Sequence, residues 1–393
     1  MGTPVIDFVG NGYDRPAPSY RKDLTEVGRG TPMGELMRRY WHPVAFKDDA
    51  GSTPRQLRIL GEDLVLFRDP QGRVGLLHER CAHRGASLYY GRVEACGIRC
   101  CYHGWAFDVE GHCVDQPCEP QGGVHKHKVR QPWYPVQERY SMIWAYLGPP
   151  AKMPVLPRYE IFENLADGEF LETDANSIGS GGPVISDFNW LQHYENVVDP
   201  FHLPILHASF SGTQFVKEMG IMPNVKFEYS AQGVNSVSLR DLPDGRKLKR
   251  ISGVALPTLR LVGNPRLGRF ERLESIGFVV PIDDTHFRIN TIGRVREKGE
   301  LNSYRSKLGG KSWPELTPDE HRQFPGDHEA QHSQGPITLH SEEHLATSDQ
   351  GISMLRRLLA QQVEIVAQGG DPIGVNFDPA ADLVSFEHGT FLL

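Results

Sequence analysis

The chain has 393 residues, of which 39% are hydrophobic and 23% charged, and its formal net charge is −7. That length suits two or three domains, and the acidic balance argues against a nucleic-acid-binding protein, which would carry a basic excess. No apolar run reaches the roughly 20 residues that span a bilayer, and the first residues lack a secretory-signal pattern. We therefore expect a soluble, cytoplasmic protein that binds neither nucleic acid nor a membrane.

The beginning of the chain predicts an arm followed by a helix. Pro32 stands near the expected helix start, a position that suits proline. Met33, Leu36, Met37 and Tyr40 recur at helical spacing, which indicates packing against a larger body. Residues 1–40 are therefore predicted to pack on a larger domain.

Two β-rich regions follow. Residues 41–149 contain short alternating runs separated by Gly, Asp and Pro turns, which predicts a small antiparallel domain. A proline-rich linker leads to residues 150–393, where longer runs predict a second antiparallel sheet with hairpin turns at Asp244-Gly245 and Asp283-Asp284. A polar excursion over 296–325 and a last helix from about 348 to 367 complete an α+β fold.

The smaller domain carries C-x-H and C-x-x-H motifs separated by 16 residues: Cys81 and His83, then Cys100 and His103. A Rieske [2Fe–2S] cluster needs two cysteines on one iron and two histidines on the other. Because Cys101 is adjacent, the three-residue step back from His103 selects Cys100 as the ligand. Both pairs are expected in loops between strands.

Three other interpretations compete for these residues. Zinc accepts mixed Cys and His ligands, but C-x-H is tighter than the usual zinc knuckle. Six cysteines in a chain of 393 residues do not resemble a small secreted disulfide scaffold. Simple core residues are the third option. The spacing favours the cluster.

A second motif, D-x-x-H-x4-H, contains Asp199, His202 and His207. Two histidines and one carboxylate form the facial triad of mononuclear non-haem Fe(II). Asp199 suits a supporting role, hydrogen-bonding a ligand imidazole and relaying electrons. The third ligand is expected far along the chain: Asp327, which opens a predicted helix, or Asp349 as the alternative.

The same distal segment matches H-E-x-x-H through His328, Glu329 and His332. This is the zinc metalloprotease pattern, in which Glu329 would be the general base. Three specified positions occur readily by chance in a chain with 17 histidines. The protease is therefore a remote alternative, and a solvated polar helix is expected instead.

Over nearly its whole length the chain resembles the catalytic α-subunits of Rieske non-haem iron oxygenases. The matching segments are "TPMGELMRRYW", the two cluster loops, "ENVVDPFHLPILH" and "QGPITLHSEEHLATSDQGI". The chain is most similar to the phthalate-dioxygenase branch, which includes aryl O-demethylases. The resemblance implies a Rieske domain over 41–149 and a catalytic iron domain over 150–393 with a curved antiparallel sheet flanked by helices.

The resemblance also implies roles for residues. Cys81, His83, Cys100 and His103 match the cluster ligands. The positions that match the mononuclear Fe(II) ligands are His202, His207 and Asp327, and Asp199 matches the aspartate that bridges the two centres across subunits.

The activity implied is that of a terminal oxygenase component in aromatic catabolism. It would use O2 and NADH electrons, delivered by a flavin/[2Fe–2S] reductase or a ferredoxin, to hydroxylate or O-demethylate an aromatic, carboxylated substrate. The assembly implied is a head-to-tail homotrimer or a multiple of trimers. Ring cis-dihydroxylation is the alternative reaction, and a Rieske electron-transfer protein is a remote alternative.

Overall fold

The computed structural model describes residues 12, 16–175, 182–212, 215–263, 271–301, 311 and 313–393. Most of the expected N-terminal arm and residues 302–310 and 312 of the expected polar excursion lie outside the described residues. Within the described part, no helix combines the length and apolar character needed to cross a membrane.

The described N-terminal part is helical. Helices α1 (Lys22–Thr25) and α2 (Pro32–Met37) pack against the long helix α8 (Gln350–Ala367). Thr31 caps α2 by accepting a hydrogen bond from the Gly34 amide, and Pro32 occupies the first helical position. Both are favoured at a helix start, so the predicted helix is confirmed.

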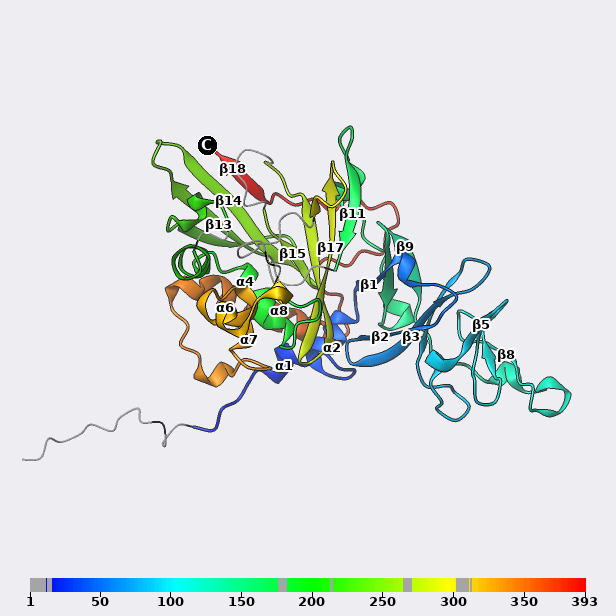
Figure 1. Ribbon diagram of the computed structural model, residues 1–393. Helices are drawn as coiled ribbons and strands as arrows, with labels where there is room; N and C mark the ends of the chain where they lie inside the picture. Colours follow the sequence, from blue (N-terminus) through cyan, green and yellow to red (C-terminus); the bar gives the residue numbers. More distant parts are fainter. Residues whose placement is uncertain are drawn as a thin grey trace, which may run out of the picture.

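Three small antiparallel sheets follow, with strand orders β1-β10-β9, β2-β3-β4 and β5-β6-β7-β8. Their strands are β1 (Trp41–Phe46), β2 (Arg55–Ile59), β3 (Glu62–Arg68), β4 (Val74–His78), β5 (Arg92–Glu94), β6 (Gly97–Arg99), β7 (Ala106–Phe107), β8 (Cys113–Asp115), β9 (Val136–Arg139) and β10 (Met142–Tyr146). The strands β5 and β8 lie at one end of the molecule (Figure 1). A separate hydrophobic core under this end includes Phe67, Leu77, Ile98 and Phe107.

The larger sheet has eight antiparallel strands in the order β11-β17-β16-β15-β14-β13-β12, with β18 paired to β14. Its strands are β11 (Phe170–Asp174), β12 (Asn224–Tyr229), β13 (Gly233–Asp241), β14 (Lys247–Ala255), β15 (Leu259–Leu261), β16 (Ser275–Asp283), β17 (His286–Val295) and β18 (Gly389–Leu392). The turns predicted after β13 and β16 are confirmed by the registers Asp241↔Lys247 and Asp283↔His286.

Helices cover one side of this sheet. They are α4 (Trp190–Val197), α5 (His202–Pro204), the π-helix η7 (Ile205–Phe210), α6 (Pro318–Gln323), α7 (Asp327–His332) and α8. The short helix α3 (Glu160–Glu163) contacts β17. In Figure 1, α4, α6, α7 and α8 gather beside the sheet, away from β5 and β8. Leu355 and Leu359 of α8 are buried in the main core, as its apolar stripe predicts.

The main core is continuous between the two β-rich regions. It contains Trp144 of β10 and Phe278 of β16, whose rings meet edge to face with centroids 5.1 Å apart. The α+β fold with a small and a large antiparallel part is therefore confirmed. The expected boundaries at residues 40 and 149 stay predictions.

Candidate metal centres

The two short loops with the Cys and His motifs have the same backbone design. In each, the cysteine amide donates to the carbonyl five residues on: Cys81 to Ala86 and Cys100 to Trp105, both at 2.9 Å. A glycine amide closes each loop, from Gly85 to the Cys81 carbonyl at 2.8 Å and from Gly104 to the Cys100 carbonyl at 3.1 Å.

Both closing glycines have positive φ, +75° and +72°, a conformation that side-chain-bearing residues rarely adopt. Cys81 and Gly85 have the same spacing as Cys100 and Gly104. That shared spacing could have identified the glycines from the sequence.

Packing brings the two loops face to face. The rings of His83 and His103 have centroids 4.6 Å apart, and Trp105 of the second loop stacks on His83 at 4.3 Å. Gln131, fully buried, accepts a hydrogen bond from the Ala82 amide at 2.7 Å. Its amide nitrogen donates to the carbonyls of His78 and Arg80 at 2.7 and 2.9 Å, which fixes the first loop.

The chemistry of these four side chains fits a two-iron cluster. Cys81 and Cys100 are buried, and His83 and His103 are half-buried. Burial raises the pKa of Cys81 to about 12, with a further contribution from neighbouring Cys100. Two thiolates there need a bound cation to offset that cost. Cys101 is exposed, as expected for a thiol turned away from the site.

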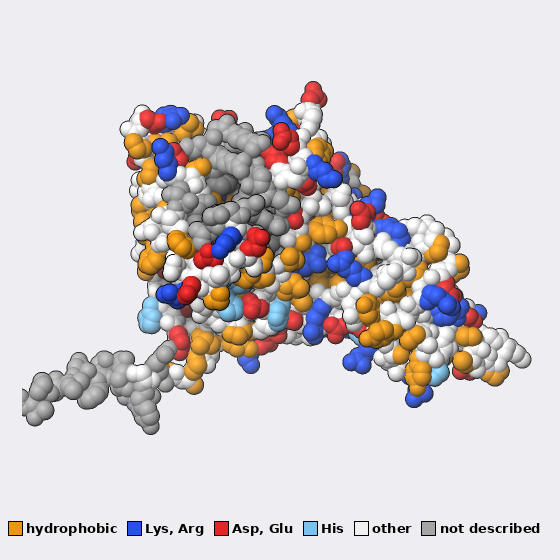
Figure 2. All heavy atoms as spheres, viewed as in Figure 1, with side chains coloured by type: hydrophobic (Ala, Val, Ile, Leu, Met, Phe, Trp, Pro, Cys, Tyr) orange, Lys and Arg blue, Asp and Glu red, His pale blue; other side chains and the backbone are white. Residues whose placement is uncertain are grey.

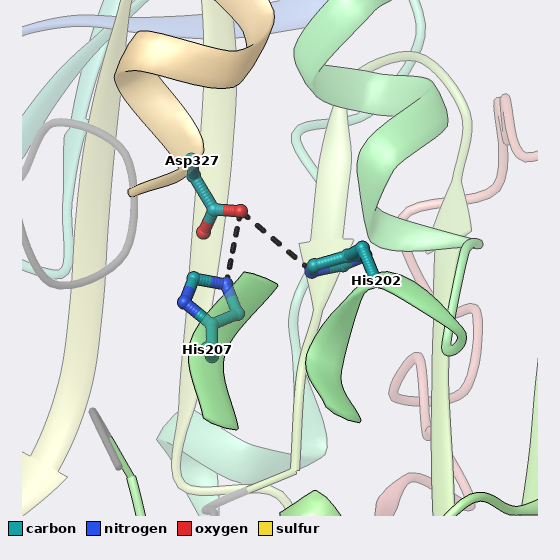
Figure 3. A group of neighbouring side chains, drawn as sticks. All are labelled: His202, His207 and Asp327. Atoms are coloured by element: carbon teal, nitrogen blue, oxygen red, sulfur yellow. Dashed lines mark hydrogen bonds and ion pairs between the residues drawn. The ribbon is translucent and has the colours of Figure 1, made fainter. Parts of the chain in front are cut away.

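The second centre is formed by His202, His207 and Asp327, whose ligand atoms all lie within 4.8 Å of one another. The Oδ1 atom of Asp327 is 3.1 Å from Nε2 of His207 and 3.6 Å from Nε2 of His202. Figure 3 shows the carboxylate and both imidazoles directed toward one point. No other group of this kind occurs in the part of the chain that the structure describes.

Three different local structures deliver these side chains. Asp327 is the first residue of α7, directly after Pro325-Gly326, as predicted. His202 begins the short helix α5, and His207 lies in the π-helix η7 that follows it. Wide π-helical turns are frequent at functional sites.

Two further side chains support this centre. Nδ1 of His202 lies 3.4 Å from Oδ2 of Asp199, at the opposite edge of the ring from Asp327. Asn196 donates from Nδ2 to Oδ1 of Asp327 at 3.3 Å. Burial opposes ionisation of Asp199, but contact with His202 outweighs it and lowers the Asp199 pKa. Asp199 therefore stays charged and orients the ring.

The spacing fits one small metal ion. Ligands about 2.1 Å from a metal and at right angles to one another lie about 3 Å apart, close to the separations from Asp327 to each histidine. Burial also opposes ionisation of Asp327, yet the charges of His207 and His202 lower its pKa strongly. Asp349 does not join this group; it caps the start of a helical turn by accepting from the Ala346 amide at 2.7 Å.

The H-E-x-x-H segment has no free general base. Oε1 of Glu329 accepts hydrogen bonds from Trp313 Nε1 and His321 Nδ1, each at 2.7 Å, and Oε2 accepts from the Gly326 amide at 2.8 Å. The helix is also not wholly solvated as expected, because His328 is buried while His332 is exposed. Glu329 thus holds the start of α7, on which Asp327 depends.

A cavity of about 170 Å³ opens beside the second centre. Its wall includes all three candidate ligands, Asp199, and side chains from β13, β14, β15, β16 and β17. Trp190 and Tyr194 are core residues and do not line this cavity. The arrangement therefore offers a buried metal-binding group next to a space for a small organic molecule.

Comparison with known proteins agrees with this geometry. A family model described as the Rieske [2Fe-2S] domain matches residues 40–135. Phenoxybenzoate dioxygenase subunit alpha from Ectopseudomonas oleovorans is 49% identical over 99% of this chain and 96% of its own length. The 5,5'-dehydrodivanillate O-demethylase oxygenase subunit from a Sphingobium species is 34% identical over 91% of this chain and 82% of its own length.

Solved structures show the same fold. Dicamba monooxygenase bound to dicamba superimposes with a TM-score of 0.62 at 17% identity, covering 84% of this chain and 99% of the other. Together with the two loops and the His-His-Asp group, these matches show that the chain belongs to the Rieske non-haem iron oxygenases, as a terminal oxygenase subunit with a [2Fe–2S] cluster and a mononuclear iron.

Proposed function

We propose that the protein hydroxylates or O-demethylates an aromatic acid, and that its metals are held by two separate sets of residues. Cys81, His83, Cys100 and His103 bind the Rieske cluster, and His202, His207 and Asp327 bind the iron. The observation that carries the proposal is the convergence of two nearby histidines with Asp327, which lies far along the sequence, beside a cavity of small-molecule size.

The residues around the iron have defined tasks in this proposal. When bound, the cluster supplies single electrons and the iron activates dioxygen. His202, His207 and Asp327 would hold the iron beside the cavity, where dioxygen and substrate could reach it. Asn196 holds the carboxylate of Asp327, and Asp199 holds the outer edge of His202. The cavity wall orients the substrate toward the iron.

Two chains together complete the catalytic unit in this proposal. The cluster loops lie with β5 and β8 at one end of the molecule, and α7 lies at the other (Figure 1). Asp199 is 28% exposed, so a neighbouring chain can reach it. We propose a head-to-tail trimer in which Asp199 links His202 to a cluster histidine of the next chain.

A separate reductase or ferredoxin supplies the electrons. Around β5 and β8, hydrophobic side chains lie beside Lys and Arg side chains on the surface (Figure 2). Tyr90 and Tyr102 are 70% and 59% exposed there. Such a mixed surface suits contact with another protein chain.

The His202→Ala variant tests the proposal. Reconstituted with its reductase and NADH, the wild type should consume oxygen only with an aromatic acid present. The variant should lose product formation and iron while its cluster spectrum stays unchanged. Continued turnover by the variant would refute the assignment.

The choice of reaction needs its own assay. Formaldehyde release from a methoxybenzoate indicates O-demethylation, whereas a cis-diol indicates attack on the ring. We favour hydroxylation or O-demethylation. Diol as the main product from several aromatic acids would establish the dioxygenase alternative.

A further inference from the structure

The cavity beside the iron group has a strongly basic wall. Arg250 of β14, Arg260 of β15 and Arg294 of β17 all line it. Apart from Asp199 and Asp327 of the metal centre, Glu274 is the one carboxylate among its described lining residues. Buried positive charge costs free energy unless an anion balances it.

Arg294 has carboxylates nearby. Burial and the charge of Arg272 lower the pKa of Arg294, while Glu169 and Glu274 oppose that shift. Its Nη2 atom donates to the Leu273 carbonyl at 2.7 Å, although its Nε is buried without a partner among the described residues. Arg294 therefore has compensation inside the protein.

Arg250 lacks such compensation. It is only 7% exposed, its Nη2 donates to the Gly263 carbonyl at 3.1 Å, and its Nε has no partner among the described residues. Burial, followed by the charges of Arg240 and Arg260, lowers the pKa of Arg250 to about 9, and among the described residues no carboxylate opposes this shift.

The charge of Arg260 interacts with that of Arg250 and with that of Asp327 in the metal centre. The Nε of Arg260 is also buried without a partner among the described residues. Burial lowers its pKa, and within the described part of the chain Asp327 is the one negative charge that opposes the shift. In the proposed function Asp327 is a metal ligand, so its negative charge does not neutralise the guanidinium groups of both Arg250 and Arg260.

Hydroxyl groups surround the two arginines on the same wall. Ser238 of β13 pairs with Arg250 of β14, and two residues along the strands Ser236 pairs with Ser252. All four line the cavity, as alternate residues of adjacent strands do. The Ser252 hydroxyl is buried without a partner in the described structure.

We infer that Arg250 and Arg260, together with the Ser252 hydroxyl, form a subsite for the carboxylate of the aromatic substrate. This inference rests on the proposed function and assigns its specificity to named residues. A carboxylate accepts paired N–H donors from guanidinium groups. An acid bound there balances both buried charges, and its ring occupies the cavity between the subsite and the iron. A neutral analogue leaves the guanidinium groups unbalanced.

The test compares meta-phenoxybenzoate with its uncharged carboxamide, which has nearly the same shape. Anaerobic calorimetry on the metal-loaded protein measures binding of each without turnover, and kcat/KM is measured separately. In the wild type the acid should bind about 10- to 100-fold more tightly than the amide, the range for losing a charged hydrogen bond. Arg250→Gln and Arg260→Gln should each remove most of this ratio while leaving amide binding nearly unchanged.

Control variants separate charge recognition from damage to the fold. Arg250→Lys keeps the charge and should retain part of the preference, and Arg294→Gln should keep the ratio within about 3-fold of the wild type. Equal binding of acid and amide by the wild type would overturn the inference, and so would parallel loss of both ligands in Arg250→Gln. Preferential acid binding without oxygenation would refute the proposed function but not the subsite.

Discussion

Gln131 is predicted to be the main support of the first cluster loop, and replacing it with leucine should release the cluster. The side chain makes three hydrogen bonds to backbone groups, with Ala82, His78 and Arg80. Because the backbone partners leave each of these three hydrogen bonds partly accessible to water, each bond contributes about 1 kcal/mol net. The loss should therefore be about 3 kcal/mol, which corresponds to about a 100-fold rise in the open population of the loop.

The assay counts iron and acid-labile sulfide in purified Gln131→Leu and records the visible spectrum and chemical denaturation. Gln137→Leu is the matched control, because Gln137 is exposed on β9 and its replacement should change stability by less than about 0.5 kcal/mol. The iron of the second centre should remain in both variants. Full cluster content and wild-type stability in Gln131→Leu would show that the loop does not depend on this residue.

Three further predictions follow from the site and the core. Asp327→Asn should lose mononuclear iron and turnover while the cluster spectrum persists, and Asp349→Asn should retain both; metal analysis of the pair decides between the two carboxylates. Asp199→Asn should keep both metals but slow reoxidation of the reduced cluster in stopped-flow measurements, and an unchanged rate would remove its bridging role. Burial lowers the pKa of His42 from 6.5 to about 4, so the unfolded chain binds the proton first as pH falls. The free energy of unfolding should then decrease between pH 6.5 and pH 4, by up to about 3 kcal/mol, and denaturation of His42→Gln should show a smaller decrease.

Local patterns account for what the sequence predicted well. The cluster motifs, the hairpin turns and the start of α7 after Pro325-Gly326 each depend on residues close together in the chain. Asp327 could be proposed as the third ligand because the preceding Pro-Gly pair predicts a helix start there, and a residue at a helix start can turn its side chain into a cavity.

Long-range contacts account for what the sequence did not reveal. Gln131 lies about 50 residues beyond the loop that it fixes, and nothing in its neighbourhood indicates that partner. Arg250 and Arg260 meet the same cavity only because β14 and β15 pair in one register. The role of Glu329 was also hidden, since Trp313 and His321 reach it through tertiary packing.

The wide turn that carries His207 restricts how this segment can change during evolution. An α-helix advances about 100° per residue, so deleting one residue from Ile205–Phe210 would rotate the following side chains by roughly that angle. Substitutions that preserve the length leave the direction of the His207 ring intact. Apart from His207, homologous chains should therefore vary in the identity of the residues of this turn far more readily than in their number.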